Sequence, residues 1–279
     1  MASVLVTGIA GFLGKNLAKT LLNRGHDVIG TAHSEVSVRD FEISVSGSSR
    51  IPVYSFDIAD CQHSIKRILK NHRIDYVVHS AALKHVGICE NNPTRAIDVN
   101  IIGSRNLITS CLEGNVKNVI GISTDKSINP SCVYGMTKKL MEEMLIESGY
   151  SVFQGVNFLF STGSVLDIWD KLMKENKEIL VNSSARRYFC IVDDVSNKIA
   201  DSLDAKGRFT VDKCYLISIQ DLQVAFSKYH NYWNVNSYKP LGVEKNDEDL
   251  PLGGIKVENP DSEFVLNLLR QHYANRNRA

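Results

Sequence analysis

The sequence lacks long runs of one charge and long runs of apolar residues. Its 32 basic residues nearly balance its 31 acidic ones, and no basic cluster occurs, so neither a nucleic acid nor a membrane is expected as its partner. No apolar stretch approaches the roughly 18 residues of a membrane-spanning helix. The chain enters an apolar strand at Ser3, which leaves no room for a signal peptide. These absences predict a soluble intracellular protein.

Cysteine is present but lacks the spacing of metal sites. The six cysteines are scattered, without a C-x-x-C pair or a histidine at zinc-binding spacing: Cys61, Cys89, Cys111, Cys132, Cys190 and Cys214. This pattern predicts reduced structural thiols, no metal site and a cytoplasmic location. With 43% hydrophobic and 23% charged residues, the 279-residue chain fits one large globular domain or a domain with a smaller appendage.

Glycines occupy the start of the chain at regular spacing. The β-branched run Ser3–Thr7 predicts a buried strand, and Lys15–Arg24 predicts a helix with leucines on one face. Between them lies a G-x-x-G-x-x-G pattern. Glycine at a strand-to-helix turn lets backbone N–H groups approach a pyrophosphate at the helix N-terminus. The pattern predicts dinucleotide binding by the residues of this turn: Gly8, Ala10, Gly11, Phe12, Leu13 and Gly14.

The second strand, Asp27–Thr31, ends where NAD and NADP are distinguished. An acidic residue there would bind the ribose 2′-hydroxyl of NAD, but no carboxylate occurs until Glu35. Thr31 and His33 are instead available for a 2′-phosphate. NADP is therefore the expected cofactor, with NAD as the alternative. Residues 35–50 are polar and serine-rich, which predicts a surface connection.

The third strand, Pro52–Phe56, ends at a carboxylate. Asp57, followed by Ile58, can accept a hydrogen bond from an adenine amino group, or it can cap the helix expected over Cys61–Asn71. Both roles are compatible, so Asp57 and Ile58 are candidate cofactor residues.

The fourth strand, Ile74–Ser80, ends in small residues. Ala81 and Ala82 allow the backbone to pass close under a cofactor. Lys84 and His85 follow them and can reach a phosphate or a sugar hydroxyl. Small residues followed by polar ones at a strand end predict a cofactor contact next to a substrate contact.

The alternation of strands and helices continues through a long helix expected over Thr94–Gly114 and a fifth strand over Val116–Ser123. Asn100 in that helix can hydrogen-bond backbone beside the cofactor. The pattern predicts an α/β fold with a Rossmann-type doubly wound parallel sheet. Residues 1–155 would form the NADP-binding domain. Residues 156–279 would form a smaller C-terminal substrate-binding region, with some segments returning to the sheet.

The stretch Gly121–Lys139 carries the candidate chemistry. It begins as the fifth strand and ends in a helix, on which Tyr134 and Lys138 are four residues apart and share one face. An ammonium beside a phenol favours the phenolate, so this pair can act as a base near neutral pH. Asp125 and Lys126 stand between strand and helix, where a sharp turn would bring both toward a substrate.

Several motifs in this order resemble one family. They are TGIAGFLG at 7–14, FDIAD at 56–60, AALKHV at 81–86, NIIGSRNLI at 100–108 and STDKSINPSCVYGMTKK at 123–139. The chain resembles the extended short-chain dehydrogenase/reductases. Within them it is similar to the UDP-N-acetylglucosamine 4,6-dehydratases of the C5-inverting type, closely over about the first 150 residues.

The second half resembles the same family through its substrate-binding segments. NFLFSTGSV at 157–165 is similar to the substrate-loop pattern and marks Asn157, Ser164 and Val165 as substrate residues. RRYF at 186–189 is similar to the segment whose arginine, here Arg187, faces the nucleotide-sugar. KPLGVEK at 239–245 marks Glu244. Gln154 and Thr162 stand where the family has arginines, which leaves the identity of the sugar open.

The resemblance implies a redox-neutral cycle on a UDP-sugar. Tyr134, assisted by Lys138 and Thr124, would take the proton of the C4 hydroxyl while C4 is oxidised. Neutral Lys126 would then remove the C5 hydrogen, and protonated Asp125 would donate to the departing C6 hydroxyl. The product would be a 4-keto-6-deoxy sugar inverted at C5. A homo-oligomer is expected by analogy.

Two alternatives use the same fold differently. A UDP-sugar 4-epimerase or 4-ketoreductase would need Thr124, Tyr134 and Lys138 but not the Asp125–Lys126 pair. A non-catalytic nucleotide-sensing protein would keep only the glycine turn. Loss of water from the sugar distinguishes the dehydratase from both.

Overall fold

The computed structural model describes residues 1–45, 50–60, 62–238 and 255–276. The chain divides into two compact units. Unit 1 comprises Met1–Gly155 and Val192–Thr210, and unit 2 comprises Val156–Ile191 and Val211–Ala279. Within the described ranges, none of the helices is long and apolar enough to cross a membrane.

Unit 1 is built on a seven-stranded parallel sheet with the order β10-β6-β5-β4-β1-β2-β3. Its strands are β1 (Ser3–Thr7), β2 (Asp27–Ala32), β3 (Val53–Ser55), β4 (Tyr76–His79), β5 (Asn118–Thr124), β6 (Ser151–Gly155) and β10 (Gly207–Phe209). The order reverses beside β1, and such a reversal opens a crevice at the carboxyl ends of the strands. The predicted doubly wound parallel sheet is confirmed.

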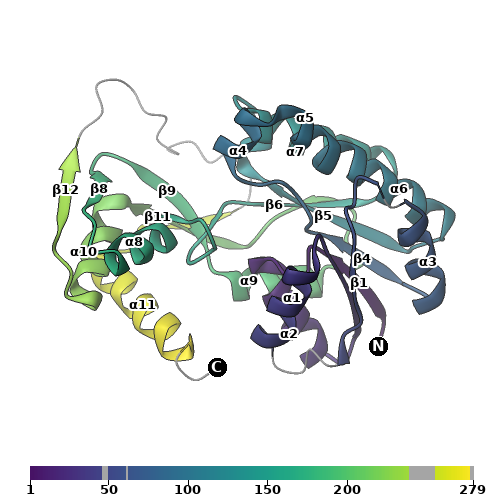
Figure 1. Ribbon diagram of the computed structural model, residues 1–279, viewed down its shortest axis with the longest axis horizontal. Helices are drawn as coiled ribbons and strands as arrows, with labels where there is room; N and C mark the ends of the chain where they lie inside the picture. The colour runs from purple at the N-terminus through teal and green to yellow at the C-terminus, as the bar shows by residue number, and fades with distance from the viewer. Residues whose placement is uncertain (46–49, 61, 239–254, 277–279) are drawn as a thin grey trace. The chain divides into compact units, whose positions relative to one another are not determined.

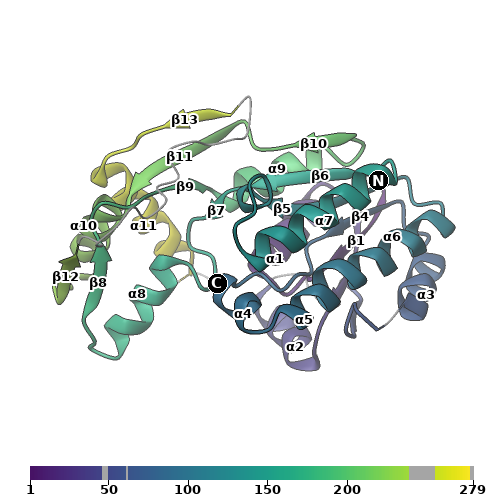
Figure 2. The same ribbon diagram turned by 90° about the horizontal axis from the view of Figure 1, so that it is seen from above.

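Helices cover both faces of this sheet (Figure 1). On one face lie α1 (Phe12–Asn23), α2 (Glu35–Ser44) and α9 (Val192–Asp201). On the other lie α3 (Gln62–His72), α4 (Val86–Asn91), α5 (Pro93–Ile97), α6 (Ser104–Glu113) and α7 (Val133–Glu147). Figure 2 shows α7, α6 and α3 side by side across this face. Because both faces are covered, the middle of each central strand is mainly apolar, and Val4, Leu5 and Val6 are all buried.

One sequence expectation for unit 1 was wrong, and a second is met with a local difference. The serine-rich stretch after β2 is not a plain connection, because helix α2 forms there with Ser34 as its N-cap, accepting from the N–H of Ser37 at 3.2 Å. The long helix expected over Thr94–Gly114 is interrupted by a π-helical segment, η2 (Asp98–Gly103), between α5 and α6. Such segments widen a helix locally and often occur at functional sites.

Unit 2 contains two small sheets and three helices among its described residues. The four-stranded sheet has the order β13-β11-β9-β7, and the two-stranded sheet pairs β12 with β8. The strands are β7 (Asn157–Phe158), β8 (Ile179–Asn182), β9 (Arg186–Cys190), β11 (Lys213–Ser218), β12 (Val235–Tyr238) and β13 (Lys256–Glu258). The helices are α8 (Val165–Lys174), α10 (Ile219–His230) and α11 (Ser262–Arg276). A separate core around Trp169, Phe226 and Leu269 holds them together.

Candidate active site

Two positions at the turn between β1 and α1 leave no room for a side chain, so only glycine fits there. Gly8 has φ +68°, and a Cβ there would lie 2.8 Å from the backbone nitrogen of Ala81. A Cβ on Gly14 would lie 2.5 Å from the carbonyl oxygen of Gly8. The N–H of Gly11 donates to that same carbonyl at 2.9 Å, and Gly11 is the N-cap of α1.

This turn fits the diphosphate of a dinucleotide. A glycine N-cap places no side chain at the N-terminus of α1, so an anion can approach the helix there. Ala10 and Phe12 flank Gly11 in the turn, whereas Leu13 is buried beneath it. The six predicted residues of the glycine pattern thus lie in one turn and in the first turn of the helix after it, where they would hold the diphosphate.

The ends of β2 and β3 lie beside the turn in the sheet. Thr31 is buried and pairs with Thr7 across the strands, whereas His33 is exposed, with its Nδ1 3.4 Å from the Ser37 hydroxyl. Asp57 accepts from the N–H of Ala59 at 3.0 Å, a bond within the turn before α3 and not to that helix, which begins at Gln62.

A cation that the sequence did not reveal also binds Asp57. Arg95 of α5 forms an ion pair with its carboxylate. Burial opposes ionisation of Asp57, but the hydrogen bonds from Ala59 and Arg95 lower its pKa below the ordinary value, and the charge of His33 acts in the same direction. Ile58 is buried beneath this group, against Gly103 of η2.

Asn100 fixes the loop that follows β4. Its side-chain oxygen accepts from the N–H of Leu83 at 2.8 Å, and its amide donates to the Leu83 carbonyl at 3.0 Å and to the Thr137 hydroxyl at 3.0 Å. This side chain therefore joins the loop to α7. Ala81 is anchored from the other side, because its N–H donates to the hydroxyl of Thr7 at 3.2 Å.

The same loop carries the predicted contacts to cofactor and substrate. Ala81 and Ala82 leave β4, and Lys84 and His85 follow, with His85 as the N-cap residue of α4. All four are partly or fully exposed. The hydrogen bonds of the loop backbone with Asn100 and Thr7 fix the positions from which these four side chains project.

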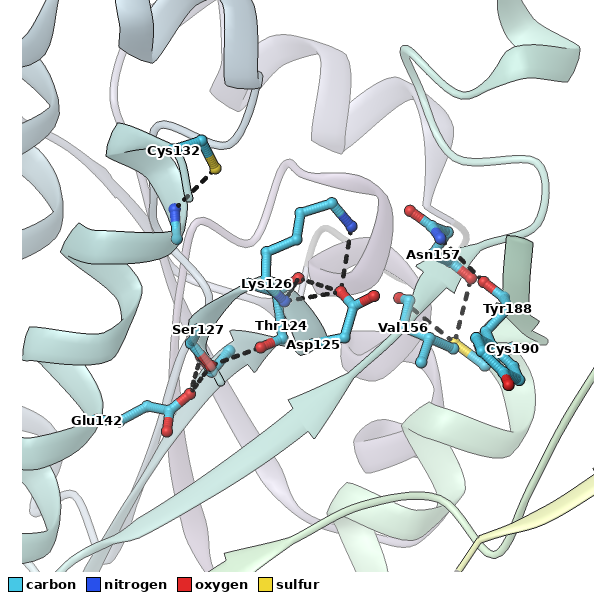
Figure 3. Close-up of polar contacts among 12 residues, drawn as sticks. Thr124, Asp125, Lys126, Ser127, Cys132, Glu142, Val156, Asn157, Tyr188 and Cys190 are labelled. Carbon is cyan, nitrogen blue, oxygen red and sulfur yellow. Dashed lines mark hydrogen bonds and ion pairs between the residues drawn. The ribbon is translucent and has the colours of Figure 1, made fainter. Parts of the chain in front are cut away.

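The Asp125–Lys126 pair lies on the sharp turn expected for it. The 3₁₀ turn η3 (Asp125–Ser127) directly follows β5. The Thr124 hydroxyl donates to Oδ1 of Asp125 at 2.7 Å, and the N–H of Lys126 donates to the same oxygen at 3.0 Å. The Lys126 ammonium also reaches this oxygen at 3.1 Å (Figure 3). Asp125 is nearly buried, whereas Lys126 is about one-third exposed, so the lysine is the part of the pair that solvent can reach.

Tyr134 lies in the first turn of the next helix, α7, and is coupled to this group. Burial raises the pKa of Tyr134 well above its ordinary value, and the charge of Asp125 adds to the increase. A hydrogen bond with Thr124 acts in the opposite direction. Thr124 therefore contacts both candidate pairs, Asp125 on one side and Tyr134 on the other.

Lys138 is buried deeper than any other lysine of the site. Only 2% of it is exposed, and its ammonium lies 3.1 Å from Sδ of Met141. Burial lowers the pKa of Lys138 to about 8, and the nearby Glu142 charge opposes this decrease. The lysine can therefore exchange a proton near neutral pH.

The sequence did not reveal three further polar residues of unit 1: His79, Glu142 and Arg208. His79 is fully buried, and its ring is hydrogen-bonded to the hydroxyls of Thr7 and Ser104, each at 2.8 Å. Burial, with the charge of Lys138, lowers the pKa of His79 to about 3. Glu142 and Arg208 bind each other at 3.2 Å. The four-residue spacing of Lys138 and Glu142 was the one available signal.

The predicted substrate residues of unit 2 occupy local structural positions. The Asn157 amide donates to the Tyr188 carbonyl at 3.0 Å, which ties β7 to β9. Ser164 is the N-cap of α8 and accepts from the N–H of Asp167 at 3.4 Å, and Val165 begins that helix. Arg187 in β9 donates to the Arg186 carbonyl at 2.9 Å. Glu244 lies outside the described residues.

Comparison with known proteins assigns the family. Residues 4–243 match the profile of the family described as polysaccharide biosynthesis protein. The chain belongs to this family. Two of its relatives, UDP-N-acetylglucosamine 4,6-dehydratases (inverting) from two strains of Campylobacter jejuni, are 28% and 31% identical to it. Each alignment covers 94% of this chain and 79% of the relative.

Solved structures show the same relationship at the level of the fold. DesIV is the dTDP-glucose 4,6-dehydratase of Streptomyces venezuelae, and its structure was solved with NAD and a second ligand bound. That structure superposes on this chain with a TM-score of 0.79 at 17% identity. The superposition covers 99% of this chain and 98% of that one. The family member described here therefore has the fold of the short-chain dehydrogenase/reductase dehydratases and epimerases, and the resemblance inferred from its motifs is confirmed.

Proposed function

We propose that this chain is an NADP-dependent UDP-N-acetylglucosamine 4,6-dehydratase that inverts C5. The observation that carries the proposal is the Asp125–Lys126 pair, held on a 3₁₀ turn by Thr124, which also bonds Tyr134. A 4-epimerase or 4-ketoreductase needs the tyrosine but has no use for a paired acid and base beside it. The two Campylobacter relatives support the sugar and the stereochemistry by their names.

The cofactor site is proposed from unit 1 alone. The glycine turn would hold the diphosphate, the Asp57 region the adenosine, and Tyr134 with Lys138 the nicotinamide ribose end. The exposed His33, with no carboxylate before Glu35, favours a 2′-phosphate and hence NADP over NAD. A bound nicotinamide would supply the oxidant for C4 and return the same hydride to C6.

Tyr134 and Thr124 would handle the C4 hydroxyl. The phenol has a raised pKa because it is buried beside the Asp125 charge, so it is protonated at rest. A positive charge next to the ring, from Lys138 or from an oxidised nicotinamide, would lower that pKa and allow the phenolate to accept the C4 hydroxyl proton. Thr124 would orient the sugar oxygen.

Asp125 and Lys126 would carry out the elimination. The C4 ketone acidifies the C5 hydrogen, which the Lys126 amine would remove as a proton. The electron pair of that C–H bond forms the C5–C6 double bond, and the C6 hydroxyl leaves as water with the proton that Asp125 donates. Reduction at C6 and protonation at C5 from the opposite face then give the inverted 4-keto-6-deoxy sugar.

The pair can reach the required protonation state by one internal transfer. The Lys126 ammonium lies 3.1 Å from Oδ1 of Asp125, and in this ion pair the proton is on the lysine. Elimination requires the same proton on Asp125, and the two states differ only in its position along one hydrogen bond. A sugar that excludes water from the pair would disfavour the separated charges and promote the transfer.

Incubation with UDP-N-acetylglucosamine in D₂O tests the proposal. Mass spectrometry should show loss of one water, and NMR should show deuterium at C5 with inverted configuration. An intact hexose epimerised at C4 would instead establish the epimerase. If neither product forms and the sugar only binds, the nucleotide-sensing alternative is correct. The homo-oligomer expected by analogy can be tested on the same sample by size-exclusion chromatography.

A further inference from the structure

A carboxylate with no access to solvent lies behind the catalytic turn. Glu142 is in α7, one helical turn after Lys138, and its side chain is 0% exposed. Burying an ionised group is costly unless hydrogen bonds and an opposite charge replace its water. The mechanism proposed above gives Glu142 no role.

Four side chains from four different elements converge on Glu142. Its Oε1 accepts from the hydroxyl of Ser123 in β5 at 2.5 Å and from the hydroxyl of Ser127 in η3. Its Oε2 accepts from the amide of Gln154 in β6 at 3.0 Å and from Arg208 in β10 at 3.2 Å. One carboxylate therefore connects α7 to the ends of two central strands, to the edge strand and to the catalytic turn.

Ser127 links this carboxylate to the acid–base pair. It is the third residue of the turn in which Asp125 and Lys126 are the first two. Its hydroxyl lies 2.6 Å from the Thr124 carbonyl oxygen and also bonds Glu142 (Figure 3). The rear of the turn is thus attached to α7, while its front presents the pair. A 3₁₀ turn of three residues has little rigidity of its own.

Arg208 supplies the charge that balances Glu142. Its guanidinium binds Glu142 and, through Nη2, Oε1 of Glu143 at 2.8 Å. Gln154 is neutral, and so are both serines. Arg208 belongs to β10, a strand that returns to unit 1 from a distant part of the chain. The balance of charge around Glu142 therefore depends on tertiary structure as well as on its helical neighbour Lys138.

We propose that Glu142 is a positioning residue for the elimination step, holding the turn of Asp125 and Lys126 in place through Ser127. The inference rests on the proposed dehydratase function. Tyr134 is placed by the helix α7 and not by the turn, so oxidation at C4 depends less on this carboxylate. Loss of Glu142 is therefore expected to slow elimination more than it slows oxidation at C4.

The test uses the full-length enzyme with bound cofactor and compares Ser127→Ala and Glu142→Gln with wild type. Two quantities are measured after mixing with UDP-N-acetylglucosamine: the absorbance of reduced nicotinamide, which reports C4 oxidation, and loss of water by mass spectrometry. Both variants should lose water about 100-fold more slowly, the size typical of a slightly misplaced catalytic group. Reduced nicotinamide should accumulate in both, because oxidation continues.

Glu143→Gln is the matched control. It removes a carboxylate from the adjacent position of the same helix, one that also binds Arg208 but is half-exposed and makes no contact with the turn in the interactions described. This variant should behave as wild type. Thermal unfolding of all variants identifies loss of structure, and Ser127→Ala, which removes one hydroxyl and no charge, is the variant least affected by it.

Two results would overturn the inference. One is loss of oxidation and elimination by the same factor in Ser127→Ala, with no accumulation of reduced nicotinamide. The other is wild-type elimination in both Ser127→Ala and Glu142→Gln. Failure of the proposed function is a different observation, because the wild-type enzyme would then release no water at all.

Discussion

The two candidate pairs of unit 1 occupy opposite physical environments. Lys138 is 2% exposed, lies against Met141, and has a pKa lowered to about 8 by burial. Lys126 is about one-third exposed and bonds Asp125 directly. The Tyr134–Lys138 pair is placed by a regular helix, whereas the Asp125–Lys126 pair is placed by a short turn that other side chains must hold.

This difference separates a general chemistry from a specific one. A helix fixes i and i+4 neighbours by its own geometry, so a tyrosine–lysine pair needs little support from outside. A 3₁₀ turn at a strand end depends on capping by Thr124 and on anchoring through Ser127. Oxidation at C4 should therefore tolerate changes around the site better than elimination does.

Tyr134→Phe should have the largest effect. Without the phenolic hydroxyl no group is placed to take the C4 proton, so oxidation should fall roughly 10³-fold, within the range for a lost general base. No reduced nicotinamide should appear and no water should be lost. Stopped-flow absorbance and mass spectrometry measure the two steps. Dehydration at the wild-type rate in this variant would contradict the role given to Tyr134.

Lys126→Ala should divide the reaction in two. Elimination should fall about 10²-fold because the base at C5 is missing, while oxidation continues and reduced nicotinamide accumulates. Asp125→Asn should give the same pattern, since its amide cannot donate a proton to the leaving hydroxyl. Lys139→Ala is the control, because Lys139 is exposed on α7 and forms a surface ion pair with Glu143. Equal loss of both steps in Lys126→Ala would remove the distinction between the pairs.

The sequence predicted the regular parts of unit 1 because their causes are local. Alternating apolar strands and helices imply a parallel sheet, and a glycine turn after the first strand implies a helix N-terminus open to phosphate. The i, i+4 spacing placed Tyr134 and Lys138 on one face of α7. Asn129 and Pro130 favoured an irregular path, and the turn η3 lies just before them.

The buried support of the catalytic turn could not be predicted in the same way. Glu142 resembles a surface residue of an amphipathic helix until Arg208, 66 residues later in the chain, is brought to it by the pairing of β10 with β6. Arg95 reaches Asp57 across 38 residues for a similar reason. Helix α2 was missed because serine is a poor helix former inside a helix but a good N-cap.

Gly135→Ala should break the turn from the helix side. A Cβ at this position would lie 2.4 Å from the carbonyl oxygen of Lys126, so the turn or the start of α7 must move. Elimination should fall roughly tenfold, because a small displacement of a catalytic group is enough. Gly87→Ala in α4 is the matched control, since a Cβ there meets nothing within 4 Å. Equal rates of water loss in the two variants would show that the turn adapts without cost.

His79 gives the smallest effect, one on stability. Its pKa is about 3 in the folded protein because it is buried beside the Lys138 charge, compared with about 6.5 when unfolded. The folded state therefore binds fewer protons between these values. The stabilisation from a neutral His79 is complete above pH 6.5 and is lost as the pH falls.

Between pH 6.5 and 4.5 the free energy of unfolding should decrease by about 2 kcal/mol from this residue. Urea denaturation at several pH values measures it, and His79→Gln, which cannot take up a proton, should flatten the decrease. His63→Gln is the control, because His63 lies exposed on α3. An unchanged dependence of the free energy of unfolding on pH in His79→Gln would contradict this account. It would mean that His79 takes up a proton in the folded protein without losing its contacts to Thr7 and Ser104. The residues beneath the β1–α1 turn would then be less rigid than their burial indicates.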